Sequence, residues 1–147
     1  QAADGIRDPL WSRGLGDVYK RQPFSSHVFD HILVDAPCSG LGVLHRRADS
    51  RWRIEEGDVK NLAKLQIDLL DSSVRLLKDG GVLSYSVCTV TNQETVDVVK
   101  SLENRHPNLI PEKLFHERWR KIGNGLQILP QDFGTDGMSM FQWKLAN

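Results

Sequence analysis

The sequence predicts an α/β domain built around a mostly parallel sheet. Three observations support this class. Short apolar runs rich in β-branched residues alternate with longer segments of helical periodicity. The first two runs are separated by a helical segment, and such a right-handed crossover places two parallel strands side by side. Two further apolar runs close the chain, and 147 residues suffice for one domain with a single core.

The first half of the domain is predicted as strand, helix, strand. HVFDHILVDAP predicts a buried strand over residues 28–34, because its apolar run stops at Ala-Pro. VKNLAKLQIDLLDSSVRLLKDGG predicts a helix, since its leucines and valines recur near helical spacing. This helix is expected to end on Gly80 and Gly81 as a C-cap. VLSYSV then predicts a second strand over residues 82–87.

The second half is predicted as a helix followed by two closing strands. NQETVDVVKSLENRHP predicts an amphipathic helix over residues 93–104 that stops before Pro107. Thr91 or Asn92 is expected to cap it, and Glu94 stands where a capping box from Thr91 requires it. LQILP and MSMFQWKLA predict the closing strands, which are separated by the turn-rich QDFGTDG.

Composition excludes several classes of protein. Lys plus Arg and Asp plus Glu both number 19, so the net charge gives no argument for a polyanionic partner. The chain has neither an apolar run of roughly 20 residues nor the apolar region of a signal peptide, which predicts a cytoplasmic protein without a membrane partner. Two cysteines are too few for a disulfide scaffold and match no zinc spacing, so free thiols and no metal are expected.

Both cysteines follow predicted strands. Asp35 and Cys38 come after the first strand, and Cys88 ends the second. Ligands of open α/β sheets bind at the carboxyl ends of the strands, so the two thiols are expected to meet where chemistry is usually done. The alternatives are that Cys88 is a small buried apolar residue and that Asp35 caps a turn.

Basic residues gather around a tryptophan in the stretch HRRADSRWRIEE, residues 45–56. Such a mixture can bind phosphates and offer a ring on which a base stacks. The alternative is a solvated loop and helix start in which the arginines pair with Glu55, Glu56 and Asp58.

Three segments together resemble the RsmB/Sun (Fmu) family of RNA cytosine-C5 methyltransferases. They are FDHILVDAPCSGLGVLHRR, LAKLQIDLLDSSVRLLKDGGVLSYSVCTVTNQET and LPQDFGTDGMSMFQW. Two cysteine motifs in this order are far more specific than a lone Gly-rich loop. The resemblance implies a Rossmann-like class I methyltransferase fold, S-adenosylmethionine as methyl donor and RNA, of the bacterial small ribosomal subunit, as substrate.

The resemblance also implies roles for individual residues. Cys88, in the Tyr-x-x-Cys-Ser/Thr motif, would be the nucleophile, and Cys38, in Asp-Ala-Pro-Cys-Ser, would help to release the product. Asp35 would lie between the methyl donor and the target base, with Pro37 also on the donor side. The basic stretch would then contact RNA through Arg46, Arg47, Arg51 and Trp52.

The chain departs from the family in its first part. No Gly-rich turn follows an apolar strand upstream, and no acidic residue follows a second one, so residues 23–147 are expected to form only the C-terminal half of the sheet. Such a chain should bind S-adenosylmethionine negligibly and expose its first strand as an apolar edge. Residues 1–22 are expected to be a disordered leader or a sequencing artefact, because their ending LGDVYKRQ resembles translated adapter sequence; the alternative is a native basic arm.

Two functions of different classes stay open on the sequence. The first is catalysis of RNA methylation by a protein of which this chain carries the cysteine motifs. The second is a non-catalytic α/β module that binds RNA or another partner and has incidental cysteines. A thiol redox protein is disfavoured because the two cysteines lack C-x-x-C spacing.

Overall fold

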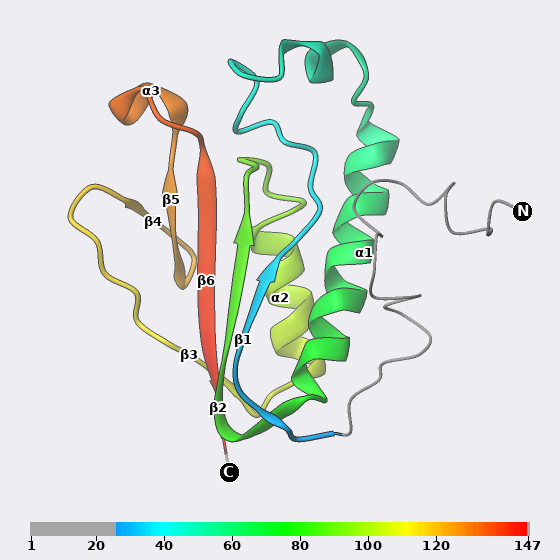
Figure 1. Ribbon diagram of the computed structural model, residues 1–147, viewed down its shortest axis with the longest axis vertical. Coiled ribbons are helices and arrows are strands. Elements are labelled where there is room, and N and C mark those ends of the chain that lie inside the picture. The colour runs from blue at the N-terminus through cyan, green and yellow to red at the C-terminus, as the bar shows by residue number, and fades with distance from the viewer. Residues whose placement is uncertain (1–25, 147) are drawn as a thin grey trace, which may run out of the picture.

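A six-stranded sheet forms the centre of the molecule in a computed structural model that describes residues 26–146 (Figure 1). The leader expected over residues 1–22 lies outside the described residues. The strands run in the order β1-β2-β6-β5-β4, and β3 also pairs with β6. The elements are β1 (Phe29–Asp35), the 3-10 helix η3 (Ala48–Trp52), α1 (Glu56–Val74), β2 (Leu77–Val87), α2 (Val96–Arg105), β3 (Leu109–Pro111), β4 (Arg120–Ile122), β5 (Gly125–Ile128), α3 (Pro130–Phe133) and β6 (Met138–Leu145).

The sheet is parallel only between β1 and β2. These strands are joined through α1, and Val34 pairs with Tyr85, as the crossover prediction requires. The pairs β2–β6, β6–β5, β5–β4 and β3–β6 are all antiparallel. The expectation of a mostly parallel sheet is therefore wrong for the described residues. Short connections join β4 to β5 and β5 to β6, and such connections give antiparallel pairs because only a long crossover can return a strand in parallel.

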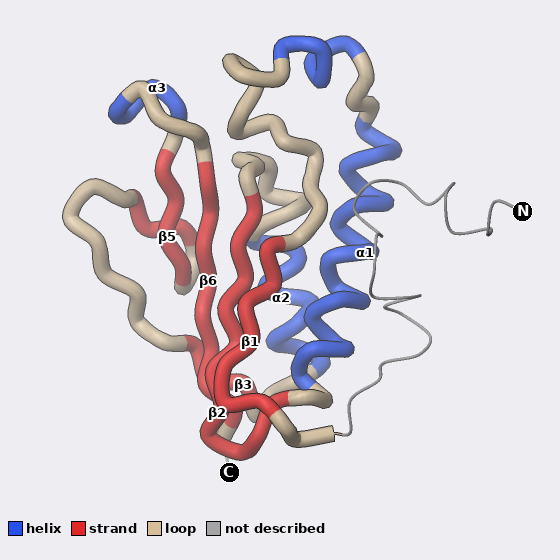
Figure 2. Tube along the Cα trace, viewed as in Figure 1, coloured by secondary structure: helices blue, strands red, loops and turns tan. Residues whose placement is uncertain are grey.

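The core lies between the sheet and two helices. Figures 1 and 2 show α1 and α2 together beside β1, β2 and β6. Tyr85 of β2 stacks on Phe141 of β6, and Phe141 stacks in turn on Trp143, with ring centroids 6.1 and 6.3 Å apart. All three rings are fully buried. Burying aromatic rings of this size is a major stabilising contribution in a domain this small.

The first helix ends earlier than its sequence pattern predicts. α1 stops at Val74, and Gly80 and Gly81 lie within β2, so their assignment as a C-cap is wrong. The two glycines serve an irregularity in the β1–β2 pairing, where the register shifts between Phe29 and His31. Gly80 adopts a positive φ of 74° there, a conformation that glycine tolerates best.

The second helix starts later than predicted. α2 begins at Val96 with Thr95 as N-cap, so neither Thr91 nor Asn92 caps it. Thr91 and Glu94 do contact each other in the turn before the helix, but the Thr91 backbone N–H donates to Thr89 and not to Glu94, so the capping box is incomplete. The Thr91 hydroxyl donates to the Glu94 carboxylate at 3.0 Å, and the Glu94 amide donates to Thr91 Oγ1 at 3.4 Å.

The closing strands are confirmed as β5 and β6. β3 and β4 were not predicted, because three residues are too few to show an alternating pattern. The turn between β5 and β6 contains the short helix α3, which starts at Pro130. Figure 1 shows α3 and η3 at the end of the molecule toward which β1 and β2 run.

Candidate functional site

The sulfur atoms of Cys38 and Cys88 lie 3.2 Å apart. Cys38 is in the loop after β1, and Cys88 directly follows β2. Because these strands are parallel neighbours, their carboxyl ends bring the two loops to one edge of the sheet. The Gly42 amide also donates to the Cys88 carbonyl oxygen at 3.0 Å, which ties the loops together at the backbone. The predicted meeting of the two thiols is confirmed.

The two thiols differ in their acidity. A hydrogen bond from the Cys38 thiol lowers the pKa of Cys88 to about 7, although partial burial opposes the shift. The same hydrogen bond raises the pKa of Cys38, and its deeper burial raises it further. Arg47 assists Cys88 by charge attraction, whereas Asp35 opposes it. The pair is therefore arranged as a Cys88 thiolate that accepts a hydrogen bond from a Cys38 thiol.

Asp35 and Pro37 lie at and just after the end of β1, before Cys38. Asp35 is the last residue of β1, is exposed, and pairs in register with Ser86. Its negative charge raises the pKa of the Cys88 thiol, against the larger effect of the Cys38 hydrogen bond. The Pro37 carbonyl oxygen accepts a hydrogen bond of 2.9 Å from the side chain of Gln66 on α1.

The basic stretch, residues 45–56, contains η3 and lies at the same end of the molecule (Figure 1). Arg46 forms an ion pair of 2.7 Å with Asp136, in the loop before β6. Arg47 and Arg51 are exposed, and Trp52 at the end of η3 is 85% exposed. Within residues 26–146 no arginine of this stretch pairs with Glu55, Glu56 or Asp58, although Arg53 lies 3.7 Å from Asp49. The stretch is mostly exposed, as the alternative of a solvated loop expects, but the ion pairs of that alternative are absent from the described residues.

A second cluster of aromatic and basic side chains was missed by sequence reasoning. The guanidinium of Arg118 lies 5.5 Å above the ring of Phe133 in α3. Phe115 is 87% exposed, and Arg120 is held by Asp132. The density of aromatic and basic residues in FHERWRK is a signal that could have indicated this surface.

A buried carboxylate next to the cysteine loops was also missed. Glu94 is fully buried and accepts hydrogen bonds from Ser39, Thr89, Thr91 and Gln66. The sequence pattern indicated only a helix cap, because three of these four partners are not local to a capping box. Contacts across 55 and 28 residues leave no signal in a single sequence.

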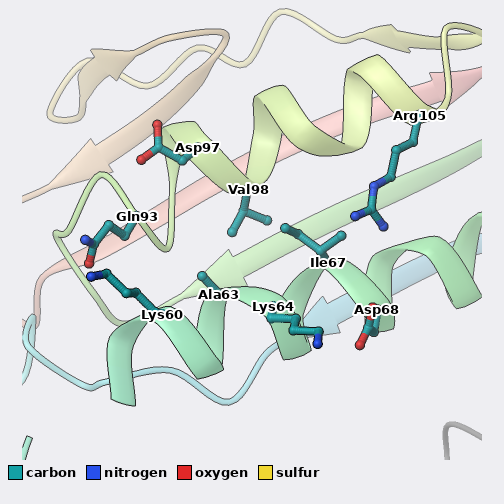
Figure 3. A pocket seen from close by; sticks show the side chains of 9 residues that line it. All are labelled: Lys60, Ala63, Lys64, Ile67, Asp68, Gln93, Asp97, Val98 and Arg105. Carbon is teal, nitrogen blue, oxygen red and sulfur yellow. The ribbon is translucent and has the colours of Figure 1, made fainter. Parts of the chain in front are cut away.

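A groove of about 320 Å³ lies elsewhere, between α1 and α2 (Figure 3). Neither cysteine lines it. Figure 3 shows charged lining residues on both helices, Lys60 and Lys64 on α1 and Asp97 and Arg105 on α2, with Ala63, Ile67 and Val98 between the helices. The groove is thus separate from the thiol pair.

The described part of the chain has neither a group of metal-binding side chains nor a helix that could span a membrane. Among residues 26–146, no three His, Cys, Asp or Glu side chains are grouped so that they could hold a metal ion. None of the helices in the same residues combines the length and apolarity needed to cross a membrane.

Comparison with known proteins gives a consistent result. Residues 13–145 match the family described as 16S rRNA methyltransferase RsmB/F, so the match begins before Pro23, and the domain boundary expected there stays a prediction. The probable ribosomal RNA small subunit methyltransferase B of Bacillus subtilis is 41% identical over 122 residues, which are 79% of this chain and 27% of that protein. Ribosomal RNA small subunit methyltransferase B of Sodalis glossinidius is 37% identical over 134 residues, 91% of this chain and 27% of that protein.

Solved structures agree with the sequence relatives. The crystal structure of PH0851 superposes with a TM-score of 0.76 at 27% identity, over 80% of this chain and 27% of that chain. NSun6 from Pyrococcus horikoshii, solved with SFG, gives a TM-score of 0.67 at 25% identity, over 79% of this chain and 30% of that chain. The chain therefore has the fold of one part of these proteins, and it spans about a quarter of the length of its curated relatives.

Proposed function

Because the chain belongs to the 16S rRNA methyltransferase RsmB/F family, we propose that it supplies the catalytic cysteines of an RNA cytosine-C5 methyltransferase. Its curated relatives are ribosomal RNA small subunit methyltransferases, which favours a cytosine of small-subunit ribosomal RNA as the target. The chain spans about a quarter of those relatives, so the activity belongs to the complete enzyme. S-adenosylmethionine, the second substrate, supplies the methyl group.

The observation that carries this proposal is the contact of 3.2 Å between the two sulfurs. C5 of cytosine is a poor nucleophile until a nucleophile adds to C6 and makes C5 electron-rich. A thiolate suits this addition and leaves again readily. The low pKa of Cys88, about 7, makes about half of these thiols ionised at neutral pH, whereas an ordinary thiol is only a few per cent ionised. Cys88 is therefore the proposed nucleophile.

Cys38 is proposed to assist product release, and Asp35 is proposed to bind the target base. After methyl transfer, C5 carries one proton too many; a base removes that proton, the C6–S bond breaks, and the electrons restore the C5–C6 double bond. Cys38, whose thiol already donates to the sulfur of Cys88, can protonate or stabilise this leaving thiolate. Asp35 can accept a hydrogen bond from the amino group of the base, or donate to N3 when protonated.

Asp35 and Pro37 are proposed on the side of the methyl donor. Both stand at the carboxyl end of β1, where donors of Rossmann-like enzymes bind. NSun6 from Pyrococcus horikoshii was solved with SFG, an analogue of S-adenosylmethionine, which supports the same donor for the complete enzyme here.

RNA contacts are proposed on exposed basic and aromatic side chains of the stretch 45–56 and of the pair formed by Arg118 and Phe133. The target base must leave its stack to reach Cys88, at a cost of a few kcal/mol that is smallest for single-stranded RNA. Exposed rings beside cations are suited to hold the neighbouring nucleotides. The proposed contacts are Arg46, Arg47, Arg51 and Trp52, together with Arg118 and Phe133.

Substitution of each cysteine in the complete enzyme tests the proposal. Cys88→Ala removes the attacking sulfur, so methyl transfer should disappear while RNA binding, which depends on phosphate contacts, changes little. Cys38→Ala leaves attack possible but slows release, so a covalent protein–RNA adduct should accumulate on a denaturing gel. Ser84→Ala is the matched control on the same strand and should retain turnover, because that hydroxyl only accepts a hydrogen bond from Gln142. Full activity of both cysteine variants would show that the thiols are structural.

A further inference from the structure

The carboxylate of Glu94 is the most heavily hydrogen-bonded side chain near the thiol pair. It lies in the turn between β2 and α2 and is 0% exposed. Five groups donate to it, and an ionised carboxylate, which only accepts, satisfies all of them. A buried carboxylate survives only where donors replace its water, so this arrangement depends on every partner being in place.

The donors come from both cysteine loops. Ser39, next to Cys38, donates its backbone N–H to Glu94 Oε1 at 2.8 Å and its hydroxyl to Oε2 at 2.5 Å. Thr89, next to Cys88, donates its hydroxyl to Oε2 at 2.8 Å. The Ser39 and Thr89 hydroxyl oxygens are themselves 3.0 Å apart. One carboxylate therefore joins the immediate neighbours of the two thiols.

The helix α1 and the strand β2 brace this carboxylate. Gln66, which is also 0% exposed, donates from Nε2 to Glu94 Oε1 at 3.1 Å and to the Pro37 carbonyl oxygen at 2.9 Å. The Tyr85 hydroxyl lies 2.9 Å from Gln66 Oε1 and 2.8 Å from the Glu94 carbonyl oxygen, and can donate to either. The network thus reaches both loops, one helix and one strand.

Helix capping does not account for this arrangement. The Thr91 hydroxyl is a local partner of Glu94 at 3.0 Å, but Ser39 and Gln66 are 55 and 28 residues away in the sequence. Capping of α2 would need no contact with the Cys38 loop, and the N-cap residue of α2 is Thr95.

We propose that Glu94 is a positioning residue, whose buried carboxylate clamps the loop after β1 to the loop after β2 and thereby holds the sulfurs of Cys38 and Cys88 in contact. The inference rests on the proposed function only in treating Cys88 as the reactive thiol. It predicts a property of that thiol in the absence of RNA and of any methyl donor. The clamp by Glu94 could therefore be correct if the proposed methylation chemistry were wrong, and the methylation chemistry could be correct without the clamp.

Loss of the clamp has a defined chemical consequence. The charged and titratable groups that act on Cys88 are Cys38, Asp35 and Arg47. Of these, Cys38 has the largest effect, and it acts only through a hydrogen bond between the two sulfurs. When the loops move apart, Cys88 loses that donor, and its pKa rises toward the ordinary thiol value of about 8.5.

The experiment is the pH dependence of Cys88 alkylation by iodoacetamide, measured on the complete enzyme without RNA or methyl donor by mass spectrometry of the peptide that contains Cys88. The unsubstituted chain should show an apparent pKa near 7. Glu94→Ala removes all five contacts and should raise it by about one unit or more. Glu94→Gln can keep its oxygen toward Ser39 N–H and Gln66, so it should raise the value by less, roughly half a unit. Near-ultraviolet circular dichroism establishes that each variant is folded.

Glu103→Gln is the matched control. Glu103 also accepts hydrogen bonds from side chains distant in sequence, from the buried Trp143 Nε1 at 2.9 Å and from Asn124, but contacts neither cysteine loop. This variant should lose stability without a change in the apparent pKa of Cys88. An unchanged Cys88 value in folded Glu94→Gln and Glu94→Ala would overturn the proposal. If Glu94→Ala does not fold, Glu94→Gln alone decides: a rise supports the clamp, and no rise overturns it. An equal rise in Glu103→Gln would also overturn it, because the effect would then reflect general loosening.

Discussion

A thiol that donates its proton to a neighbouring sulfur stabilises that neighbour as a thiolate. Two cysteines in contact therefore need not be equivalent, and here the difference follows from their surroundings. Cys38 is the more buried of the two, whereas Cys88 also receives a hydrogen bond from its own backbone amide and attraction from Arg47. The deeper thiol, Cys38, therefore has the higher pKa, and Cys88 has the lower one.

The charges around Cys88 give a prediction about pH. Arg47 lowers the pKa of Cys88 and Asp35 raises it, so Arg47→Ala should move the alkylation profile to higher pH, and Asp35→Asn to lower pH. Both residues are exposed, and exposed charges are screened, so each shift should be roughly a few tenths of a pH unit. The measurement is the iodoacetamide rate of Cys88 at low and at high salt. Shifts of the opposite sign, or shifts that grow with salt, would contradict this assignment.

At the scale of elements, the loops after β1 and β2 are held at the backbone by a glycine. The Gly42 amide donates to the Cys88 carbonyl at 3.0 Å, and the Gly42 carbonyl accepts from Gly137, before β6, at 2.8 Å. A Cβ on Gly42 would lie 2.3 Å from the Gly137 carbonyl oxygen and 2.9 Å from that of Cys88. These are backbone atoms that cannot move aside cheaply.

Gly42→Ala should therefore destabilise the domain by about 1–3 kcal/mol. Urea unfolding followed by tryptophan fluorescence measures this change. Gly57→Ala is the matched control, since a Cβ on Gly57, in the first turn of α1, meets nothing within 4 Å. That substitution should be neutral or stabilise by up to about 1 kcal/mol. Equal stabilities of the two variants would show that the Gly42 contacts are not tight.

Prediction from sequence succeeded for elements whose evidence is local. β1, β2, β5 and β6 follow apolar runs, and the meeting of Cys38 and Cys88 follows from two adjacent parallel strands. The direction of the later strands was predicted wrongly, because strand composition does not show which way a strand runs, and β6 returns antiparallel to β2 after a long segment. The contacts of Glu94 with the cysteine loops were not predicted. The pattern Thr-x-x-Glu suggests only a local helix cap, and Ser39 lies 55 residues away in the sequence.

In the whole molecule, one face of the sheet packs against helices, and one end of the sheet carries the thiols. α1 and α2 cover one face, while the carboxyl ends of β1 and β2, with η3 and α3 around them, form the end that carries the thiols (Figure 1). Among the described residues β1 has β2 as its only neighbouring strand, and Leu33 on β1 is 65% exposed. The exposed edge expected of the first strand is thus present in residues 26–146.

Cys88, and not Cys38, is proposed to bond to C6 of the target base. RNA in which the target cytosine carries fluorine at C5 tests it in the complete enzyme. Attack and methyl transfer can proceed on this base, but no proton remains at C5, so the sulfur cannot be expelled and the adduct persists. Protease digestion and mass spectrometry then identify the modified peptide.

If Cys88 is the nucleophile, a nucleotide adduct should be found on the peptide that contains Cys88, formed also by Cys38→Ala and absent from Cys88→Ala. An adduct on the peptide that contains Cys38, or the absence of any adduct while ordinary RNA is still methylated, would contradict it.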